Sequence, residues 1–246
     1  MHRNPADPVV PPAAGDAELP DFPSAAGDAA CVLVSGFEPF GGEPQNPSWE
    51  IVRALHGRRL GAHPVRGLRL PCRFDEAPRQ LLAAVARHRP VLVLAIGQAG
   101  GRAEMGLERV AINLDDARIP DNAGAQPLDR PVVAGGPAAY FSTLAVKAGA
   151  AALREAGLPA VVSHTAGTFV CNHVFYALQH ALAGSGVASG FLHVPWMASQ
   201  APRHPGQPWL PLEAMVEGVA KLLPVLLAAR GAEAGPGAAA SAGTLH

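Results

Sequence analysis

The sequence predicts a single-domain α/β protein, a three-layer α/β/α sandwich with a mostly parallel, twisted central sheet. Short apolar runs alternate along the chain with helical patterns, which is typical of this class. The clearest run, residues 91–96, is continuously apolar, as expected of a parallel strand that is covered on both faces. The 246 residues, 49% hydrophobic and 16% charged, suffice for one full core.

Composition excludes several classes of partner. The net charge is −1 and no block of Lys or Arg occurs, so neither nucleic acid nor a membrane surface is expected as a partner. The most apolar late stretch, residues 212–229, contains charges and a proline and is too short to span a bilayer. The protein is therefore expected to be soluble.

Cysteine usage indicates a reducing compartment. The three cysteines are widely spaced and form no metal-type pattern with histidine, so neither a disulfide framework nor a metal site is expected: Cys31, Cys72 and Cys171. A cytoplasmic location fits this usage.

The two ends of the chain differ from the rest in composition. Residues 1–28 are rich in Pro, Ala, Gly and Asp and lack the apolar run of a signal peptide, which predicts a disordered extension. Residues 232–246 are rich in Gly and Ala and predict a disordered tail. One folded domain is expected between them, over residues 29–231, without an internal repeat.

The first half of the domain predicts three strands and two helices. A buried strand at 32–34 leads to the loop Gly36-Phe-Glu-Pro-Phe-Gly-Gly42, and Asn46 can cap a helix whose first turn holds Pro47. A strand at 65–70 and a helix at 75–88 follow. The strand at 91–96 then ends in the loop Gly97-Gln-Ala-Gly-Gly101.

The second half is less regular at its start. A strand is predicted at 110–114, a turn-rich loop at 115–127, and a helix that opens at 136–140 and runs to about 156. A strand at 160–163 precedes a helix with apolar residues four apart, and a strand at 190–194 follows it. Residues 196–209 predict a loop, and residues 212–229 a final helix with a kink at Pro224.

This order of elements predicts where the functional site lies. In sheets of this kind, sites form at the carboxyl ends of the strands. Four loops should therefore meet at one edge: residues 36–42, 97–101, 165–171, and the segment after His193.

Cys171 is the candidate nucleophile. It follows a strand and a turn at Gly167, and it begins a helix. A helix N-terminus presents free N–H groups and a partial positive charge, which should lower the pKa of the thiol and could stabilise an oxyanion. The alternative is a small buried apolar side chain, the usual fate of a free cysteine.

A thiol nucleophile needs a base, and His193 is the best placed. It ends the strand after Cys171 and should reach the same sheet edge. His164 remains possible. His173 lies two residues beyond the thiol, does not face it on a helix, and is expected at the surface or partly buried. The residues alone leave open which acid orients the base; the candidates are Glu108, Asp115, Asp116 and Asp121.

The glycine loops do not predict a nucleotide site. The loop at 97–101 follows a strand, but it is neither GxGxxG nor GxxxxGK[ST].

Seven stretches stand out in order, over about residues 31–200. They are Gly36-Phe-Glu-Pro-Phe-Gly-Gly42 with Asn46-Pro-Ser-Trp49, Gly97-Gln-Ala-Gly-Gly-Arg102, Glu108-Arg-Val-Ala-Ile-Asn113, Ala117-Arg-Ile-Pro-Asp-Asn122, Gly135-Gly-Pro-Ala-Ala-Tyr140, Ala166-Gly-Thr-Phe-Val-Cys-Asn-His173 and Phe191-Leu-His-Val-Pro195. Together they resemble the pyroglutamyl-peptidase I (pyrrolidone carboxyl peptidase) family of cysteine peptidases.

The resemblance implies a cytoplasmic enzyme that removes N-terminal pyroglutamyl (5-oxoprolyl) residues from peptides and needs no metal or cofactor. The family's nucleophile falls on Cys171, its base on His193 and its orienting acid on Glu108. A lactam pocket is implied at Phe37, Phe40, Gln98, Ile119, Phe169 and Val170, with hydrogen-bonding support from Asn46 and Arg118. Many members are homo-oligomers, so a dimer or a tetramer is a possibility.

One segment departs from the family. After Pro195 this chain has Trp196-Met-Ala-Ser-Gln200, where the family usually has Tyr and then a Pro-Glu-Gln-like stretch. Two alternatives stay open, the first of them because of this segment. One is a cysteine hydrolase of the same fold that acts on another small acyl-amide. The other is a non-catalytic protein that binds pyroglutamate.

Overall fold

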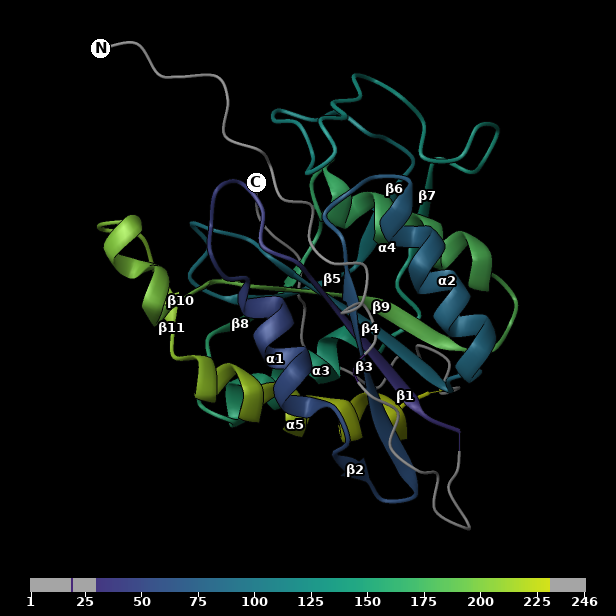
Figure 1. Ribbon diagram of the computed structural model, residues 1–246. Helices are drawn as coiled ribbons and strands as arrows, with labels where there is room; N and C mark the ends of the chain where they lie inside the picture. The colour runs from purple at the N-terminus through teal and green to yellow at the C-terminus, as the bar shows by residue number, and fades with distance from the viewer. Residues whose placement is uncertain (1–18, 20–29, 231–246) are drawn as a thin grey trace.

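The computed structural model describes residue 19 and residues 30–230, and its centre is a seven-stranded sheet of order β2-β3-β1-β4-β9-β5-β8 (Figure 1). β3, β1, β4 and β9 are parallel, whereas β5 is antiparallel to β9 and parallel to β8. The strands are β1 (Val32–Phe37), β2 (Arg59–Leu60), β3 (His63–Leu70), β4 (Leu92–Gln98), β5 (Met105–Glu108), β8 (Ala160–Ser163) and β9 (Ala188–Val194).

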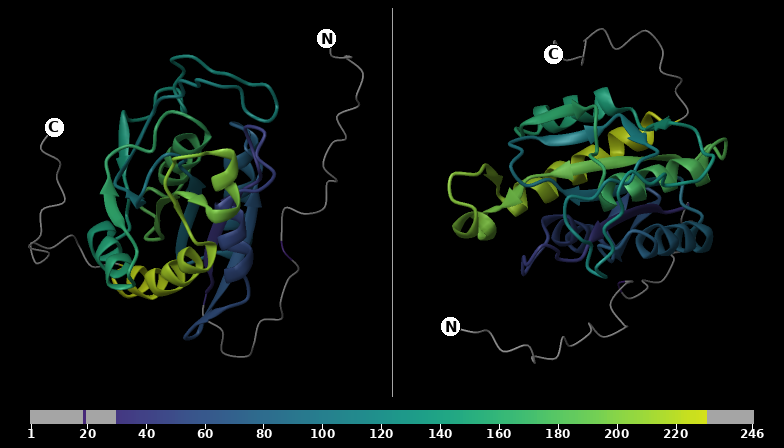
Figure 2. Two further views of the ribbon diagram at one scale, coloured as in Figure 1. Left: turned by 90° about the vertical axis from the view of Figure 1, so that its left-hand side faces the viewer. Right: turned by 90° about the horizontal axis from the view of Figure 1, so that it is seen from above.

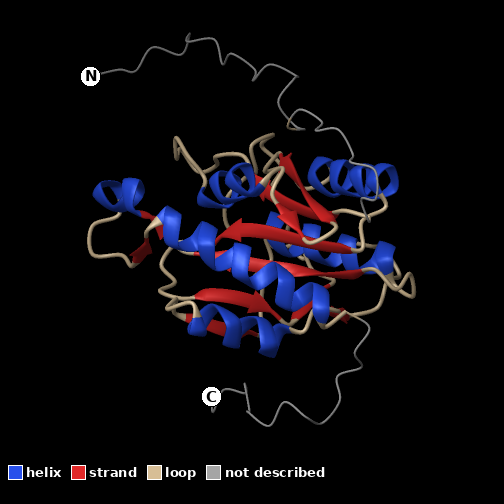
Figure 3. Ribbon diagram, turned by 90° about the horizontal axis from the view of Figure 1, so that it is seen from below, coloured by secondary structure: helices blue, strands red, loops and turns tan. Residues whose placement is uncertain are grey.

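Helices cover both faces of this sheet, which confirms the predicted three layers (Figures 1 and 3). Helices α1, α3 and α5 pack together on one face, and α2 and α4 on the other. Each face has its own apolar core, so the central strands are buried on both sides. The helices are α1 (Pro47–Leu55), α2 (Glu76–His88), α3 (Val146–Glu155), α4 (Val170–Leu182) and α5 (Leu212–Ala228).

The elements predicted with the strongest local signals are confirmed. Asn46 caps α1, since its Oδ1 accepts a hydrogen bond from the Ser48 N–H at 3.0 Å, and Pro47 lies in the first turn. The apolar run at 91–96 forms most of β4, whose seven residues are all buried. The helix after Phe169 and the strand that ends at Val194 also form as expected.

The structure departs from the predictions at three places in the less regular regions. β5 was not predicted, although it supplies Glu108 to the sheet. Residues 139–141 form strand β7 (Ala139–Phe141), which pairs with β6 (Val110–Ile112), and the helix starts only at Val146. Residues 196–210 are a loop only in part, because they contain β10 (Trp196–Met197), the 3₁₀ helix η1 (Ala198–Arg203) and β11 (Trp209–Leu210). These three short elements project from the body of the molecule (Figure 2).

The predicted tails lie outside the described residues, apart from Leu19. Within the described ranges, no helix combines the length and the apolar composition that a bilayer span needs.

Candidate functional site

The structure places Cys171 in the first turn of α4, over the end of β4. An added Cβ at Gly97 would lie 2.7 Å from the Cys171 Sγ and 2.8 Å from the Phe191 ring, closer than real Cβ contacts. A side chain at position 97 would therefore fill the space of the thiol. Gly97 is also the register partner of His193 on β9, so the thiol and this histidine meet over the same pair of strand ends.

His193 and Glu108 form a buried pair beside the thiol. The Nδ1 of His193 lies 2.7 Å from the Glu108 Oε1, and the two side chains are 5% and 0% exposed. A carboxylate can only accept, so Nδ1 carries the proton and donates, and Nε2 is left as the basic nitrogen. The antiparallel register of β5 and β9 puts Glu108 opposite Phe191, two residues before His193.

Arg102 is the third side chain in this cluster, and it was not among the predicted site residues. Its Nη1 donates to the Glu108 Oε1 at 2.9 Å, and its Nη2 donates to the Thr165 carbonyl at 3.1 Å. Arg102 was visible only as the last residue of a glycine-rich stretch. Its contact depends on β5, which the sequence did not reveal.

The expected lowering of the thiol pKa is wrong for the free protein. Burial and, to a smaller extent, the charge of Glu108 raise the pKa of Cys171 to about 12, against the opposing effect of the Arg102 charge. Loss of water around the sulfur thus outweighs the helix N-terminus, and the thiol is protonated at neutral pH. A base must remove its proton for it to act as a nucleophile.

The competing candidates are engaged elsewhere. His173 is buried rather than at the surface, and its Nδ1 lies 2.9 Å from the Asp115 Oδ2. Asp121 accepts hydrogen bonds from the backbone of Phe74 and of its own turn. Asp116 and His164 are exposed. Among the acids considered from sequence, Glu108 is the one in contact with His193.

Most residues of the expected lactam pocket belong to one apolar cluster next to Cys171. Phe37 and Val170 lie inside this cluster, and Phe40 and Phe169 pack against it with ring centroids 6.2 Å apart. Ile119 is 37% exposed on the loop that covers this side. The rings come from two segments of the chain, β1 with the loop after it and the turn before α4, near the thiol at the start of α4.

Gln98 is placed differently from the apolar members. Consecutive strand residues point to opposite faces, and Gly97 faces Cys171, so the Gln98 side chain leaves on the other face. Its Oε1 accepts from the Gln200 Nε2 at 3.0 Å, and both side chains are buried. Gln200 is itself fixed, because its Oε1 accepts from the Met197 N–H.

Gln200 also joins the loop after β1 to the segment after β9. Its Nε2 lies 3.1 Å from the Glu43 Oε2, and Glu43 accepts further hydrogen bonds from Arg203 and His204. Burial alone would raise the pKa of Glu43, but these hydrogen bonds lower it on balance. Since the Glu43 N–H donates to the Phe40 carbonyl, this network supports the loop that carries Phe40.

The remaining predicted residues lie around these two groups. Asn46 is 1% exposed and donates from Nδ2 to the Glu38 carbonyl at 3.0 Å, which holds the same loop against α1. Arg118 is exposed on the loop beside Ile119. Trp196, in the divergent segment, stacks on His204 at 3.9 Å and covers Gly100, where an added Cβ would meet its ring.

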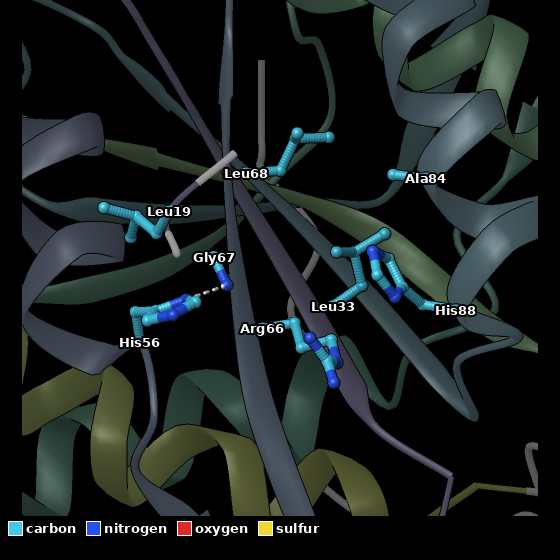
Figure 4. Close-up of a pocket in the computed structure, with 8 residues that line it drawn as sticks. All are labelled: Leu19, Leu33, His56, Arg66, Gly67, Leu68, Ala84 and His88. Atoms are coloured by element: carbon cyan, nitrogen blue, oxygen red, sulfur yellow. Dashed lines mark hydrogen bonds between the residues drawn. The ribbon is translucent and has the colours of Figure 1, made fainter. Parts of the chain in front are cut away.

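Two other features lie apart from this site. The small cavity in Figure 4, about 10 Å³, has room for about one water and is lined by none of the predicted site residues. Its His56 Nδ1 accepts from the Gly67 N–H at 3.0 Å. Among the described residues, no cluster of three His, Cys, Asp or Glu side chains is arranged to hold a metal ion.

Comparison with known proteins identifies the family. The family model described as Pyroglutamyl peptidase matches residues 30–227. The pyrrolidone-carboxylate peptidase of Cupriavidus pinatubonensis is 56% identical over 200 residues, 80% of this chain and 93% of that protein. The pyrrolidone-carboxylate peptidase of Klebsiella pneumoniae is 54% identical over 199 residues, with the same coverage of both chains.

Solved structures agree with these relatives. The crystal structure of pyroglutamyl peptidase I from Bacillus amyloliquefaciens is similar with a TM-score of 0.78 and 40% identity, over 80% of this chain and 95% of that one. A mutant pyrrolidone carboxyl peptidase from Pyrococcus furiosus is similar with a TM-score of 0.78, over 80% and 98% of the two chains. Since the family model covers most of the sequence, this chain belongs to the pyroglutamyl peptidase family.

Proposed function

We propose that this chain is a cysteine peptidase that removes N-terminal pyroglutamyl residues from peptides, with Cys171 as the nucleophile, His193 as the base and Glu108 as the acid that orients the base. The observation that carries the proposal is the buried Glu108–His193 pair at 2.7 Å, beside a thiol that rests on Gly97. A base held in one tautomer next to a protonated thiol is what thiol activation requires.

The first half of the reaction forms a thioester. His193 takes the proton of Cys171 at Nε2 as the sulfur attacks the pyroglutamyl carbonyl carbon. No side chain caps the N-terminus of α4, so its first N–H groups are available to the oxyanion. When the tetrahedral adduct collapses, the C–N bond breaks and His193 gives its proton to the leaving amine.

The second half restores the enzyme. Water attacks the thioester carbon while His193 takes a proton from it, and the C–S bond then breaks. Pyroglutamate leaves, and the proton on His193 returns to the Cys171 sulfur. The balance is one water consumed for one amide bond cleaved, and no cofactor takes part in these steps.

The pocket suits a neutral, flat ring. Phe37, Phe40, Phe169, Val170 and Ile119 offer apolar contact for its faces. Backbone groups at the strand ends are proposed as partners for the lactam N–H and C=O, with Gln98 holding the pocket wall through Gln200. Proline lacks the ring carbonyl and carries a charged amine, so it would leave buried polar groups unpaired, at about 1–3 kcal/mol each.

The setting of this activity is also a proposal. The substrates are peptides with N-terminal pyroglutamate, and the catalytic domain comprises residues 29–231. Cys31, Cys72 and Cys171 are all free thiols, which favours the reducing cytoplasm. A homodimer or homotetramer is the proposed assembly, on the resemblance alone.

A panel of aminoacyl reporters tests the substrate. Pyroglutamyl-, prolyl- and glutamyl-aminocoumarin are compared at equal concentration, and turnover of the pyroglutamyl reporter alone is expected. Turnover of the prolyl or glutamyl reporter without the pyroglutamyl one would favour a hydrolase of another small acyl-amide. Tight binding of pyroglutamate without any turnover would favour a binding protein.

A further inference from the structure

Glu108 is an unusual carboxylate because its two oxygens are used unequally. Oε1 receives hydrogen bonds from both His193 and Arg102, at 2.7 and 2.9 Å. Oε2 is buried and has no hydrogen-bond partner among the described residues. The side chain is 0% exposed. A buried carboxylate with one unpaired oxygen favours its neutral form unless a nearby cation opposes this.

Arg102 is the cation that meets this need. Its guanidinium is held at three points, by the Glu108 Oε1, by the Thr165 carbonyl at 3.1 Å and by the Ser163 Oγ at 3.4 Å. Gly106 leaves room for it, since an added Cβ there would lie 3.2 Å from the Arg102 Nη1. Arg102 thus ties the loop after β4 to β5 and to the start of the segment that leads to Cys171.

We infer that Arg102 is a positioning residue of this site: its charge and its hydrogen bond hold the Glu108 carboxylate turned toward His193, so that His193 holds its proton on Nδ1 and presents Nε2 to Cys171. A neutral Glu108 would instead donate its own proton to Nδ1 and leave Nε2 protonated, which is the wrong tautomer for a base. This inference rests on the proposed peptidase function.

The surroundings of Glu108 give the sign of the effect. His193 faces it from β9, Arg102 from the loop after β4 and Cys171 from α4, whereas β8 offers only the Ser163 hydroxyl. α3 packs on β5 through the apolar contact of Gly149 with Leu107. Arg102 is the one fixed positive charge in this group. Its removal takes a positive charge away from this site, so the pH profile is expected to move upward.

The test is the pH dependence of kcat/KM for a pyroglutamyl-aminocoumarin reporter. In Arg102→Gln, the acid midpoint is expected to rise by about one pH unit. Activity below that midpoint then falls about tenfold, while KM stays within about twofold because Arg102 lies outside the pocket. Arg102→Lys keeps the charge and is expected to restore the midpoint. If Arg102→Gln does not fold, Arg102→Lys alone still tests the inference, since a shift of a full unit in it would contradict a role for charge.

Arg130→Gln is the matched control. Arg130 lies 3.2 Å from the buried Asp115, which pairs with the buried His173, so an arginine, a carboxylate and a histidine meet there as well. Its removal is expected to leave the acid midpoint in place, whatever it does to KM. A loss of kcat in Arg102→Gln with an unmoved midpoint would show a merely structural role and overturn the inference.

A second readout separates this inference from the proposed function. The rate of iodoacetamide labelling at Cys171, followed by mass spectrometry of its peptide, needs no turnover. Its pH profile should move upward in Arg102→Gln. If the wild-type protein did not hydrolyse the pyroglutamyl reporter but Arg102→Gln still moved the labelling profile, the proposed function would be overturned and the role of Arg102 supported. If the wild-type protein hydrolysed the reporter but Arg102→Gln moved neither pH profile, the proposed function would be supported and the role of Arg102 overturned.

Discussion

The proposed mechanism depends on one partly buried thiol. Burial raises the pKa of Cys171 to about 12, so the sulfur is protonated in the free protein and depends on His193 to become a nucleophile. Cys171 and His193 therefore differ from a thiolate–imidazolium pair that exists before the substrate binds.

Cys171→Ser is expected to abolish turnover and to leave the fold intact. The hydroxyl fits the space over Gly97, but it is a much weaker nucleophile than the thiol. Reporter hydrolysis should fall at least about a thousandfold, with thermal unfolding close to that of the wild type. Cys31→Ala, at a buried thiol that donates to the His88 carbonyl at 3.8 Å, is the control and should stay active. If Cys171→Ser kept more than about a few per cent of activity, the nucleophile would lie elsewhere.

Removing the base should lower kcat more than weakening the orientation of the base does. His193→Ala is expected to lower kcat by about 10²–10⁴-fold, the usual contribution of a general base. Glu108→Gln keeps a hydrogen-bonding side chain beside Nδ1 and should lower kcat by less. The comparison uses kcat at the pH optimum of each variant. Equal losses in the two variants would mean that Glu108 does more than orient His193.

At the scale of residues, the sequence selected the candidate groups but did not reveal their environment. A turn before a helix predicted Cys171, and a strand end predicted His193. The choice of Glu108 came from the family resemblance, because its position depends on β5, a four-residue strand whose pairing is long-range. The raised pKa of Cys171 depends on burial by residues distant in sequence, which no local pattern reveals.

At the scale of elements, the segment after β9 is anchored by polar contacts to the loop after β1. Gln200, Arg203 and His204 converge on Glu43, and Trp196 stacks on His204. The divergence of Trp196-Met-Ala-Ser-Gln200 from the family pattern therefore falls on an ordered segment that contacts the loop carrying Phe40, and it leaves the Gln200–Gln98 contact in place.

Glu43→Gln should destabilise the protein at neutral pH and less in acid. The folded state lowers the pKa of Glu43, so its contribution is complete above the pKa of the unfolded chain and is lost as pH falls through the folded value. Urea unfolding should show a loss of about 1–3 kcal/mol at neutral pH. Glu50→Gln, which removes an ion pair with the exposed Arg53, is the control and should cost less. A loss that stays equal as the pH is lowered would contradict the role of the Glu43 charge.

Elements with strong local signals were predictable, and short elements were not. A capped helix and an apolar seven-residue strand carry their pattern in a few neighbouring residues. Strands β7 and β10 have three and two residues and exist because a distant strand pairs with them. The direction of β8 likewise follows from its pairing with β5, so its antiparallel course relative to β9 could not be inferred from its own sequence.

At the scale of the whole molecule, the two-sided covering of the sheet leaves its edge as the place for chemistry. The ends of β4 and β9, the first turn of α4 and the loop before β5 meet there, in a chain of the pyroglutamyl peptidase family. The described residues, 30–230, include the whole family match at 30–227. The fold class was predictable because alternating apolar strands and amphipathic helices admit few layered arrangements.

The most direct test is hydrolysis of a pyroglutamyl-aminocoumarin reporter by the reduced protein, with and without prior treatment with iodoacetamide. The account predicts turnover that iodoacetamide abolishes, with the loss of activity parallel to labelling of Cys171. Inactivation should be faster at higher pH, because the pKa of this thiol is raised. A folded, reduced protein that does not hydrolyse the reporter, or one whose hydrolysis survives complete labelling of Cys171, would contradict it.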